Sequence, residues 1–205
     1  MSAEVFKIQG LKGKKTLQGE IAVGGAKNAA LKAMVSTVLF SDTVVLKNVL
    51  DIEDMRRIAD LMADIGMQIE KKGKNIYQVR APKKDKTTLA PDIAKKLRSS
   101  IVLTGPLLAR TGSVSFPHPG GCVIGARPID LFLYSFEKLG AVVKEKKHEY
   151  ILEVPDKVLT GSEIFLPTPS VTVTETVMMA ATLAKGVTTI KNVALEHGIA
   201  HLAEF

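Results

Sequence analysis

The residue whose setting points most directly to chemistry is Cys122, the only cysteine in the 205-residue chain. It lies in the run Pro-His-Pro-Gly-Gly-Cys-Val-Ile-Gly-Ala-Arg-Pro at 117–128, a composition typical of a loop with unusual backbone angles. Pro128 suits the first turn of a helix, because an apolar period resumes at Ile129. The pattern therefore predicts a thiol on a loop that leads into a helix N-terminus.

Arg127 lies five residues after this thiol and gives it a chemical role to test. A guanidinium and a helix dipole both favour the thiolate, so they would lower the pKa of Cys122 and prepare it for proton transfer or attack. The alternative is a small buried hydrophobic residue, the usual role of a free cysteine. The neighbouring glycines and arginine favour the reactive role.

Two further sites combine positive charge with a predicted helix. Lys27 and Asn28 follow a strand expected at 20–23 and precede an apolar helix, so they would stand at a helix N-terminus, a natural anion site. A solvated lysine fits this short segment equally well. Arg98 is expected on a helix that includes Ile93 and Ile101, where it either solvates the outer edge or pairs with a carboxylate or phosphate.

An internal repeat predicts the elements that position these groups. Residues 39–49 and 183–193 have similar sequences. Each contains a helix end, a turn and a β-branched strand that ends in Lys-Asn-Val. Residues 58–69 and 133–143 are also alike, because in both an amphipathic helix stops at a glycine and a strand follows. A basic hairpin comes next in each. The unit is therefore helix, strand, helix, strand, strand.

Composition indicates a globular chain with a sizeable core, at 46% hydrophobic and 24% charged residues. The net charge of +7 comes largely from lysines clustered at predicted turns without interleaved aromatic residues, so no nucleic-acid partner is expected. Positive potential would still attract an anionic substrate. His148, His197 and His201 lack metal-ligand spacing, so no metal is expected, and His118 is given no role.

The sequence contains no stretch that is long and apolar enough to span a bilayer, and no signal peptide is recognised at its start. One cysteine cannot form an internal disulfide, which suits a reducing compartment. We therefore expect a cytoplasmic protein without a membrane partner.

Several separated motifs together carry a family resemblance. The Cys122 loop resembles the catalytic loop of the UDP-N-acetylglucosamine enolpyruvyl transferases (1-carboxyvinyltransferases), which are similar to the EPSP synthases. The similarity runs from about Ile8 to about Val193. The other motifs, in the order of the family, are Gly24–Ala30, Leu97–Ser100, Gly105–Arg110 and Pro169–Val171.

The resemblance implies an α/β fold, an inside-out α/β barrel of repeated strand-helix units with helices at the centre, as in enolpyruvyl transferases and RNA 3'-phosphate cyclases. Members of the family are longer and bind substrate between two such domains. We therefore expect residues 21–205 to form one domain whose last repeat is incomplete. Residues 1–20 are expected to belong with a missing second, C-terminal domain.

The resemblance also implies roles for individual residues. Cys122 would give a proton to the methylene carbon of phosphoenolpyruvate, Lys27 and Asn28 would contact that substrate, and Arg127 would engage its phosphate. Arg98 would contact the nucleotide sugar. The uridine and diphosphate are expected along Pro128, Ile129, Asp130, Leu131 and Phe132 and along Ser170, Val171 and Thr172.

Two positions depart from the family pattern. Phe132 stands where many members have histidine, so ring stacking would replace a polar contact to uridine. Thr172 stands where many have glycine, which narrows the approach to the phosphate.

The implied reaction transfers enolpyruvyl from phosphoenolpyruvate to the 3'-hydroxyl of UDP-N-acetylglucosamine and releases phosphate, the first committed step of peptidoglycan synthesis. It needs no cofactor. The base that deprotonates the hydroxyl is expected from the missing half, so this chain alone is expected to be inactive or incomplete.

Three alternatives stay open. The shikimate-pathway enolpyruvyl transferase shares the fold, but the Pro-Gly-Gly-Cys loop argues against it. An RNA-processing cyclase would need a histidine nucleophile motif that the sequence lacks. A non-catalytic remnant, which binds ligand weakly or not at all, is separated from the enzyme only by an assay.

Overall fold

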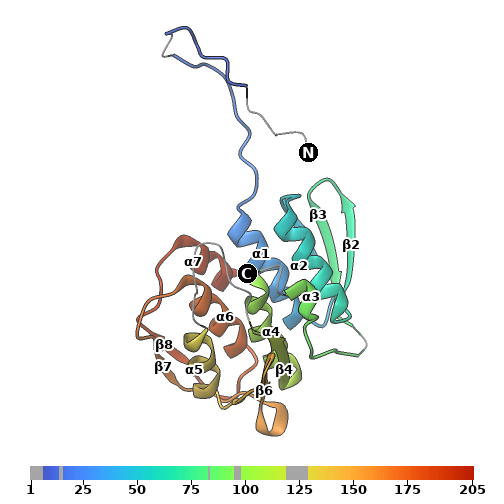
Figure 1. Cartoon of the computed structure of the whole chain (residues 1–205), viewed down its shortest axis with the longest axis vertical. Coiled ribbons are helices and arrows are strands. Elements are labelled where there is room, and N and C mark those ends of the chain that lie inside the picture. The colour runs from blue at the N-terminus through green and yellow to red at the C-terminus, as the bar shows by residue number, and fades with distance from the viewer. Residues whose placement is uncertain (1–6, 14–15, 83, 95–97, 119–128) are drawn as a thin grey trace.

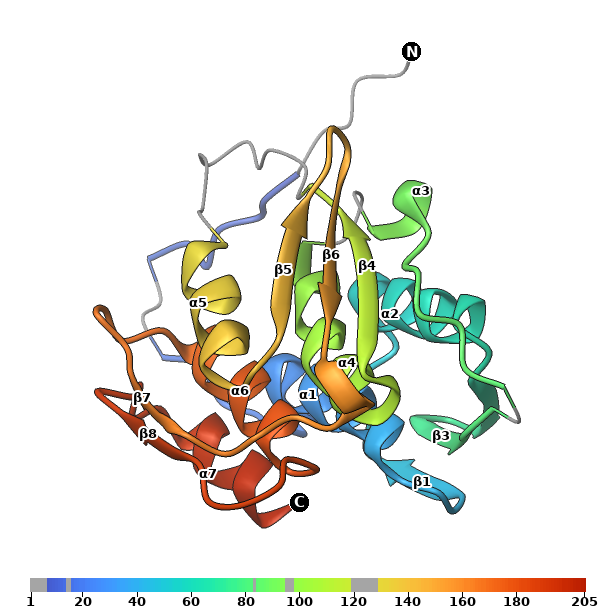
Figure 2. The same cartoon turned by 90° about the horizontal axis from the view of Figure 1, so that it is seen from below.

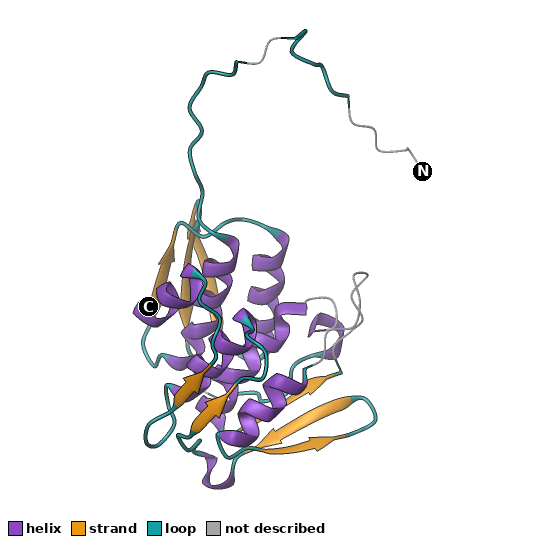
Figure 3. Cartoon of the chain, turned by 90° about the vertical axis from the view of Figure 1, so that its left-hand side faces the viewer, coloured by secondary structure: helices purple, strands orange, loops and turns teal. Residues whose placement is uncertain are grey.

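A computed structural model describes residues 7–13, 16–82, 84–94, 98–118 and 129–205, with the backbone alone at Arg98. Helices gather in the middle of the domain, and strands lie around them (Figures 1 and 3). The described strands form two three-stranded sheets and one two-stranded sheet. This arrangement confirms the expected inside-out organisation, with helices inside and sheets outside.

The first repeat has the predicted order of helix, strand, helix, strand, strand. Its elements are α1 (Lys27–Ser36), the 3₁₀ helix η1 (Thr37–Leu39), β1 (Val44–Lys47), α2 (Glu53–Asp64), β2 (Gln68–Gly73) and β3 (Ile76–Arg80). The sheet order is β1-β3-β2, and both pairings are antiparallel. The last strand of the unit therefore lies between the other two.

The second repeat has the same topology, with sheet order β4-β6-β5 (Figure 2). Its elements are α3 (Pro91–Ala94), the 3₁₀ helix η2 (Arg98–Leu103), α4 (Thr104–Thr111), β4 (Ser113–Pro117), α5 (Asp130–Lys138), β5 (Val142–Glu145) and β6 (Glu149–Glu153). Of the helix expected through Ile93 and Ile101, Ile93 lies in α3, and Arg98 and Ile101 lie in the 3₁₀ helix η2. Residues 95–97 between them lie outside the described residues.

The third repeat contains a strand, a helix, a strand and a helix within the described residues. Its elements are the 3₁₀ helix η3 (Pro155–Lys157), β7 (Glu163–Phe165), α6 (Val171–Ala181), β8 (Thr189–Lys191) and α7 (His197–Glu204). β7 pairs with β8 in parallel, as expected for two strands joined through a helix.

Matching turns confirm the repeat at the level of single residues. Gly66 and Gly140 both have positive φ, at 102° and 91°, and each ends an amphipathic helix. The N–H of the next residue then donates to a carbonyl five residues back, the Schellman arrangement that glycine favours. Asn48 and Asn192 occupy the left-handed region at φ 59° and 56° in the two Lys-Asn-Val segments.

The centre of the domain is the contact between α4 and α6. α4 is buried from Thr104 to Ala109, and α6 is buried from Val173 to Val177. A Cβ atom placed on Gly105 would lie 2.4 Å from the Thr176 carbonyl oxygen, so only glycine allows this approach. The α2 helix, by contrast, buries one stripe and exposes the other, as an outer helix does.

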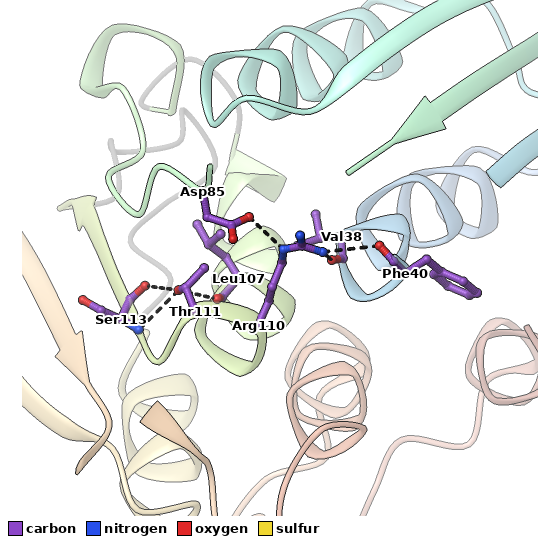
Figure 4. A network of polar contacts seen from close by, with 7 residues as sticks. All are labelled: Val38, Phe40, Asp85, Leu107, Arg110, Thr111 and Ser113. Atoms are coloured by element: carbon purple, nitrogen blue, oxygen red, sulfur yellow. Dashed lines mark hydrogen bonds and ion pairs between the residues drawn. The ribbon is translucent and has the colours of Figure 1, made fainter. Parts of the chain in front are cut away.

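Arg110 joins the first and second repeats near the end of α4 (Figure 4). Its Nε donates to the Asp85 carboxylate at 2.7 Å, and one terminal nitrogen donates to the carbonyl oxygens of Val38 and Phe40 at 3.0 and 3.3 Å. Those two carbonyls lie at the C-terminal end of η1, where main-chain acceptors need partners. Arg110 of the second repeat therefore caps the C-terminal end of η1 in the first repeat.

A charged pair is buried between α1 and α6. Lys32 Nζ lies 2.5 Å from Glu175 Oε2, and the two side chains are 9% and 2% exposed. Gly198 at the start of α7 packs beside the same carboxylate. Burial raises the pKa of Glu175, and the nearby Lys32 ammonium opposes that rise.

The segment before α1 behaves differently from the domain. Residues 16–26 contain no helix or strand, and the segment extends away from the domain (Figure 1). Ile21 and Val23 are 91% and 93% exposed. The strand expected at 20–23 is absent from the described structure, because no neighbouring strand supplies its main-chain partners. The assignment of residues 1–20 to a second domain stays a prediction.

No helix in the described ranges has the length and apolar character needed to cross a membrane.

We expect removal of one member of the Lys32–Glu175 pair to destabilise the domain strongly, because it leaves a buried charge without a partner. Lys32→Met should lower the free energy of unfolding by about 3–5 kcal/mol. The double variant Lys32→Met/Glu175→Met should recover most of that loss, since neither charge remains. Urea unfolding measures both changes. Lys144→Met is the matched control, because Lys144 forms an exposed ion pair with Glu153, and it should lower the free energy of unfolding by less than about 1 kcal/mol. Equal losses for the buried and exposed pairs would contradict this account.

The raised pKa of Glu175 predicts a pH dependence of stability. A carboxyl whose pKa is higher in the folded state stabilises the fold below its unfolded value, and this contribution is lost as pH rises through the folded value. The difference in free energy of unfolding between the wild type and Glu175→Gln should therefore become smaller as the pH rises above the ordinary pKa range of glutamate. Unfolding series at several pH values test the sign. A difference that grows with pH would mean that the Lys32 ammonium, and not burial, dominates.

Candidate functional site

The residues that sequence analysis singled out lie at the starts of helices. Lys27 is the first residue of α1, Arg98 is the first of η2 and Val171 is the first of α6. They precede the next strand of their repeats, β1, β4 and β8, by 17, 15 and 18 residues. The three residues thus occupy nearly equivalent positions in the three repeats, a relation that the sequence motifs did not reveal.

The α1 start, where an anion site was predicted, has no negative side chain of its own in its first turn. No side chain caps it, and its first turn contains no acidic residue, although helix N-termini favour both. Lys27 and Asn28 stand there instead, both exposed. The free N–H groups of the first turn, the helix dipole and a lysine all favour a negative ligand.

Asp54 is a neighbour of Lys27 that sequence reasoning missed. It lies in the first turn of α2, and its carboxylate forms an ion pair with the Lys27 ammonium, which is half exposed. The pair places the starts of α1 and α2 side by side. It also puts a negative charge where an incoming anion would compete for the same lysine. No spacing in the sequence links these two residues, because the contact is between separate helices.

The segment with Cys122 connects β4 to α5. Cys122, Arg127 and Pro128 lie outside the described residues, so their predicted roles stay predictions. The described ends agree with the expected topology, since β4 ends at Pro117 and Ile129 is the N-cap residue of α5. The helix begins at Asp130, slightly later than the first-turn position expected for Pro128.

The start of α5 contains both buried and exposed residues. Ile129 and Phe132 are 8% and 7% exposed and belong to the core. Asp130 is exposed, and Leu131 is half-buried. Phe132 packs with the core in the described structure, at 7% exposed. Its expected contact with uridine stays a prediction.

The start of α6 is capped by its own sequence. The Ser170 hydroxyl accepts a hydrogen bond from the Val173 N–H at 3.5 Å, and Val171 and Thr172 are half-buried. The Thr172 carbonyl accepts from the Thr176 hydroxyl at 2.7 Å. In the described part of the chain, no hydrogen bond or ion pair joins predicted binding residues from different helices.

Comparison with known proteins agrees with this arrangement. The profile of the EPSP synthase (3-phosphoshikimate 1-carboxyvinyltransferase) family matches residues 11–205. The chain belongs to this family. Two curated relatives, from Wolinella succinogenes and Desulfatibacillum aliphaticivorans, are named UDP-N-acetylglucosamine 1-carboxyvinyltransferase. Each is 42% identical, over 94% and 95% of this chain.

The chain spans about half the length of these relatives, 45% and 46%. Solved structures show the same fold at low identity. The enolpyruvyl transferase NikO from Streptomyces tendae aligns with a TM-score of 0.76 at 17% identity, over 92% of this chain and 44% of that one. An EPSP synthase from Acinetobacter baumannii aligns with a TM-score of 0.67 at 17% identity, over 89% and 42%. The fold is that of the enolpyruvyl transferases.

Within the described ranges, no group of histidine, cysteine and acidic side chains is placed to hold a metal ion.

We expect the α1 start to bind a phosphate dianion through Lys27, and Asp54 to weaken that binding. Asp54→Asn should tighten binding and Lys27→Met should weaken it, each by about two- to fivefold, the scale of a charge at an exposed helix end. Titration with inorganic phosphate at constant ionic strength, followed by amide chemical shifts in α1, measures both. Lys86→Met removes a lysine from a comparable exposed pair with Asp64 and should change nothing. Weaker binding by Asp54→Asn would show that the carboxylate orients the lysine instead of competing for it.

Proposed function

We propose that this chain is the cysteine-bearing part of an enolpyruvyl transferase that acts on UDP-N-acetylglucosamine. The observation that carries the proposal is the Pro-Gly-Gly-Cys-Val-Ile-Gly-Ala-Arg-Pro sequence at 119–128, between β4 and α5 of an enolpyruvyl transferase fold. The names of the relatives, at 42% identity, support the same substrate. The wider EPSP synthase family alone would leave the acceptor open.

In the proposed reaction the enolpyruvyl group of phosphoenolpyruvate moves to the sugar 3'-hydroxyl, and phosphate leaves. The Cys122 thiol gives its proton to the methylene carbon, so positive character develops at C2. The sugar hydroxyl attacks that carbon and loses its proton, which gives a tetrahedral intermediate. Loss of phosphate and of a methyl proton then restores the double bond in the enolpyruvyl product.

Charge stabilisation is assigned to the helix starts. Lys27 and Asn28 at α1 would meet the phosphoenolpyruvate anion, and Arg127 its phosphate, as fixed groups that need no rearrangement during the reaction. The start of α6 would hold the diphosphate through main-chain N–H groups at Ser170–Thr172. Arg98 at η2 would contact the nucleotide sugar.

The proposed substrate site is completed outside this chain. The relatives are about twice as long, and the proposed reaction needs a base that no described residue is assigned to supply. We therefore propose that a further domain closes over the helix starts. The chain alone should bind UDP-N-acetylglucosamine far more weakly than the complete enzyme, because it lacks shared contacts and preorganisation.

We expect Cys122→Ala to lower turnover by about 10²–10⁴-fold, the usual contribution of a positioned proton donor. Affinity for UDP-N-acetylglucosamine should change little, since the thiol acts in proton transfer and not in binding. Phosphate release is measured after mixing this chain with the C-terminal half of a curated relative, and calorimetry gives the affinity.

Two controls separate the alternatives. Replacing the sugar nucleotide by shikimate 3-phosphate should abolish phosphate release, and faster release with shikimate 3-phosphate would favour the shikimate-pathway enzyme. Treatment with the epoxide phosphonate fosfomycin in the presence of the sugar nucleotide should add one adduct at Cys122, seen by intact mass. Full turnover by Cys122→Ala would remove the cysteine from the mechanism.

A further inference from the structure

His118 is the last described residue before the segment that contains Cys122, and its main chain is held to the neighbouring hairpin. Its N–H donates to the His148 carbonyl oxygen at 3.2 Å, which extends the β4–β6 pairing one residue beyond Pro117. Pro117 and Pro119 on either side have no N–H to donate. His118 is therefore the residue of this triplet that can continue the ladder.

The imidazole of His118 makes a second attachment to the same hairpin. Its Nε2 lies 3.0 Å from the Lys146 carbonyl oxygen. A carbonyl oxygen only accepts hydrogen bonds, so Nε2 carries the proton and donates it. The Glu145 carboxylate lies 3.7 Å from the same nitrogen. Glu145 is the last residue of β5 and Lys146 is the first residue of the turn before β6, in the hairpin that Figure 2 shows extending beyond the helices.

Aromatic stacking provides a third attachment. The His118 ring stacks on Tyr150 with centroids 4.5 Å apart and planes at 20°. Tyr150 stacks in turn on Phe116, its cross-strand partner, at 5.6 Å and 27°. The Tyr150 hydroxyl donates to Glu145 at 3.0 Å, which orients its ring. The imidazole thus ends a ladder of three rings that begins in the buried part of the sheet, where Phe116 is 3% exposed.

We propose that His118 is a positioning residue, which fixes the end of β4 to the β5–β6 hairpin and so fixes the point from which the segment with Cys122 departs. The inference rests on the proposed function, in which Cys122 is the proton donor. Cys122 follows His118 by only four residues, so we expect a shift of the end of β4 to change the position of the thiol. Misplacement of a reacting group by about 1 Å is enough to change rates strongly.

The contacts argue against the two other roles for this histidine. A solvated side chain would not need a carbonyl acceptor, a ring partner and a ladder hydrogen bond at once. The Nε2 proton is already directed at Lys146, so Nε2 is not free to give its proton to a substrate, and a general-base role would have to use Nδ1.

The test measures the reactivity of the Cys122 thiol in the 205-residue chain, so it does not require turnover. His118→Ala should slow alkylation by iodoacetamide at neutral pH by about threefold or more and move the pH profile of the rate upward, since the thiol would be displaced from the electropositive setting predicted for it from Arg127 and the helix N-terminus. His118→Gln keeps a donor for Lys146, and His118→Phe keeps the ring for Tyr150. Each should restore part of the rate.

His148→Ala is the matched control, a histidine of the same hairpin whose side chain is exposed and whose main-chain carbonyl remains. It should leave the rate and the pH profile unchanged. Circular dichroism and urea unfolding establish that each variant is folded. An unchanged rate and profile in folded His118→Ala would overturn the proposal, as would equal effects of His118→Ala and His148→Ala.

The outcomes also separate this inference from the proposed function. If His118 were a general acid–base, all three His118 variants would lose turnover equally in the mixture with a C-terminal half while thiol reactivity stayed constant, and positioning would be wrong. If Cys122→Ala kept full turnover, the proposed function would fail, yet the effect of His118 on the thiol would still be measurable.

Discussion

The close approach of α4 and α6 is the constraint on which the rest of this structure depends. The two helices meet where a Cβ on residue 105 would lie 2.4 Å from the Thr176 carbonyl oxygen, and both are buried along most of their length. The main-chain N–H and C=O groups of a buried helix pair with each other except at its two ends. The main-chain groups that remain free to bind a polar ligand are therefore at the helix starts and the adjoining turns. The predicted ligand groups lie at such starts in all three repeats.

Lys32 and Glu175 are the buried charged side chains among the described residues, and the position of the pair gives it a specific structural role. Lys32 lies in α1 five residues after Lys27, and Glu175 lies in α6 three residues after Thr172. A buried salt bridge contributes little net free energy to folding, because both charges lose their hydration. It holds the two helices in place, since separating the pair would leave each charge buried without a partner. It therefore sets the separation between two of the helix starts assigned to ligand binding.

Local signals in the sequence predicted most of the fold. The glycines at 66 and 140 and the Lys-Asn-Val segments each specify their turn within a few residues, so the repeating unit could be read without knowledge of the contacts. The strand expected at 20–23 was wrong because a strand needs a neighbour, which a local pattern cannot supply. The 3₁₀ form of the helix at Arg98–Leu103 could not be predicted, because apolar spacing does not distinguish an α-helix from a 3₁₀ helix.

The candidate site was predictable in its residue types and less so in its contacts. The ion pair of Lys27 with Asp54 joins two helices, and no spacing encodes it. Phe132 was placed correctly on the helix after Cys122, and its burial in the core, at 7% exposed, could not be read from the sequence. The exposed Asp130 in the first turn of the same helix stays a predicted binding residue.

The residues that flank the 119–128 segment are held by different interactions, and these interactions fix the two points between which the segment with Cys122 runs. At the first end, His118 is held by hydrogen bonds and ring stacking on a hairpin. At the second end, Ile129 is held by burial, at 8% exposed, against the core that α4 and α6 organise. Both anchors belong to the second repeat, whereas Lys27 and Ser170 belong to the first and third. If the proposed function holds, the thiol of the second repeat must meet predicted binding groups of the other two repeats, and the packing of α4 against α6 is what holds those repeats together.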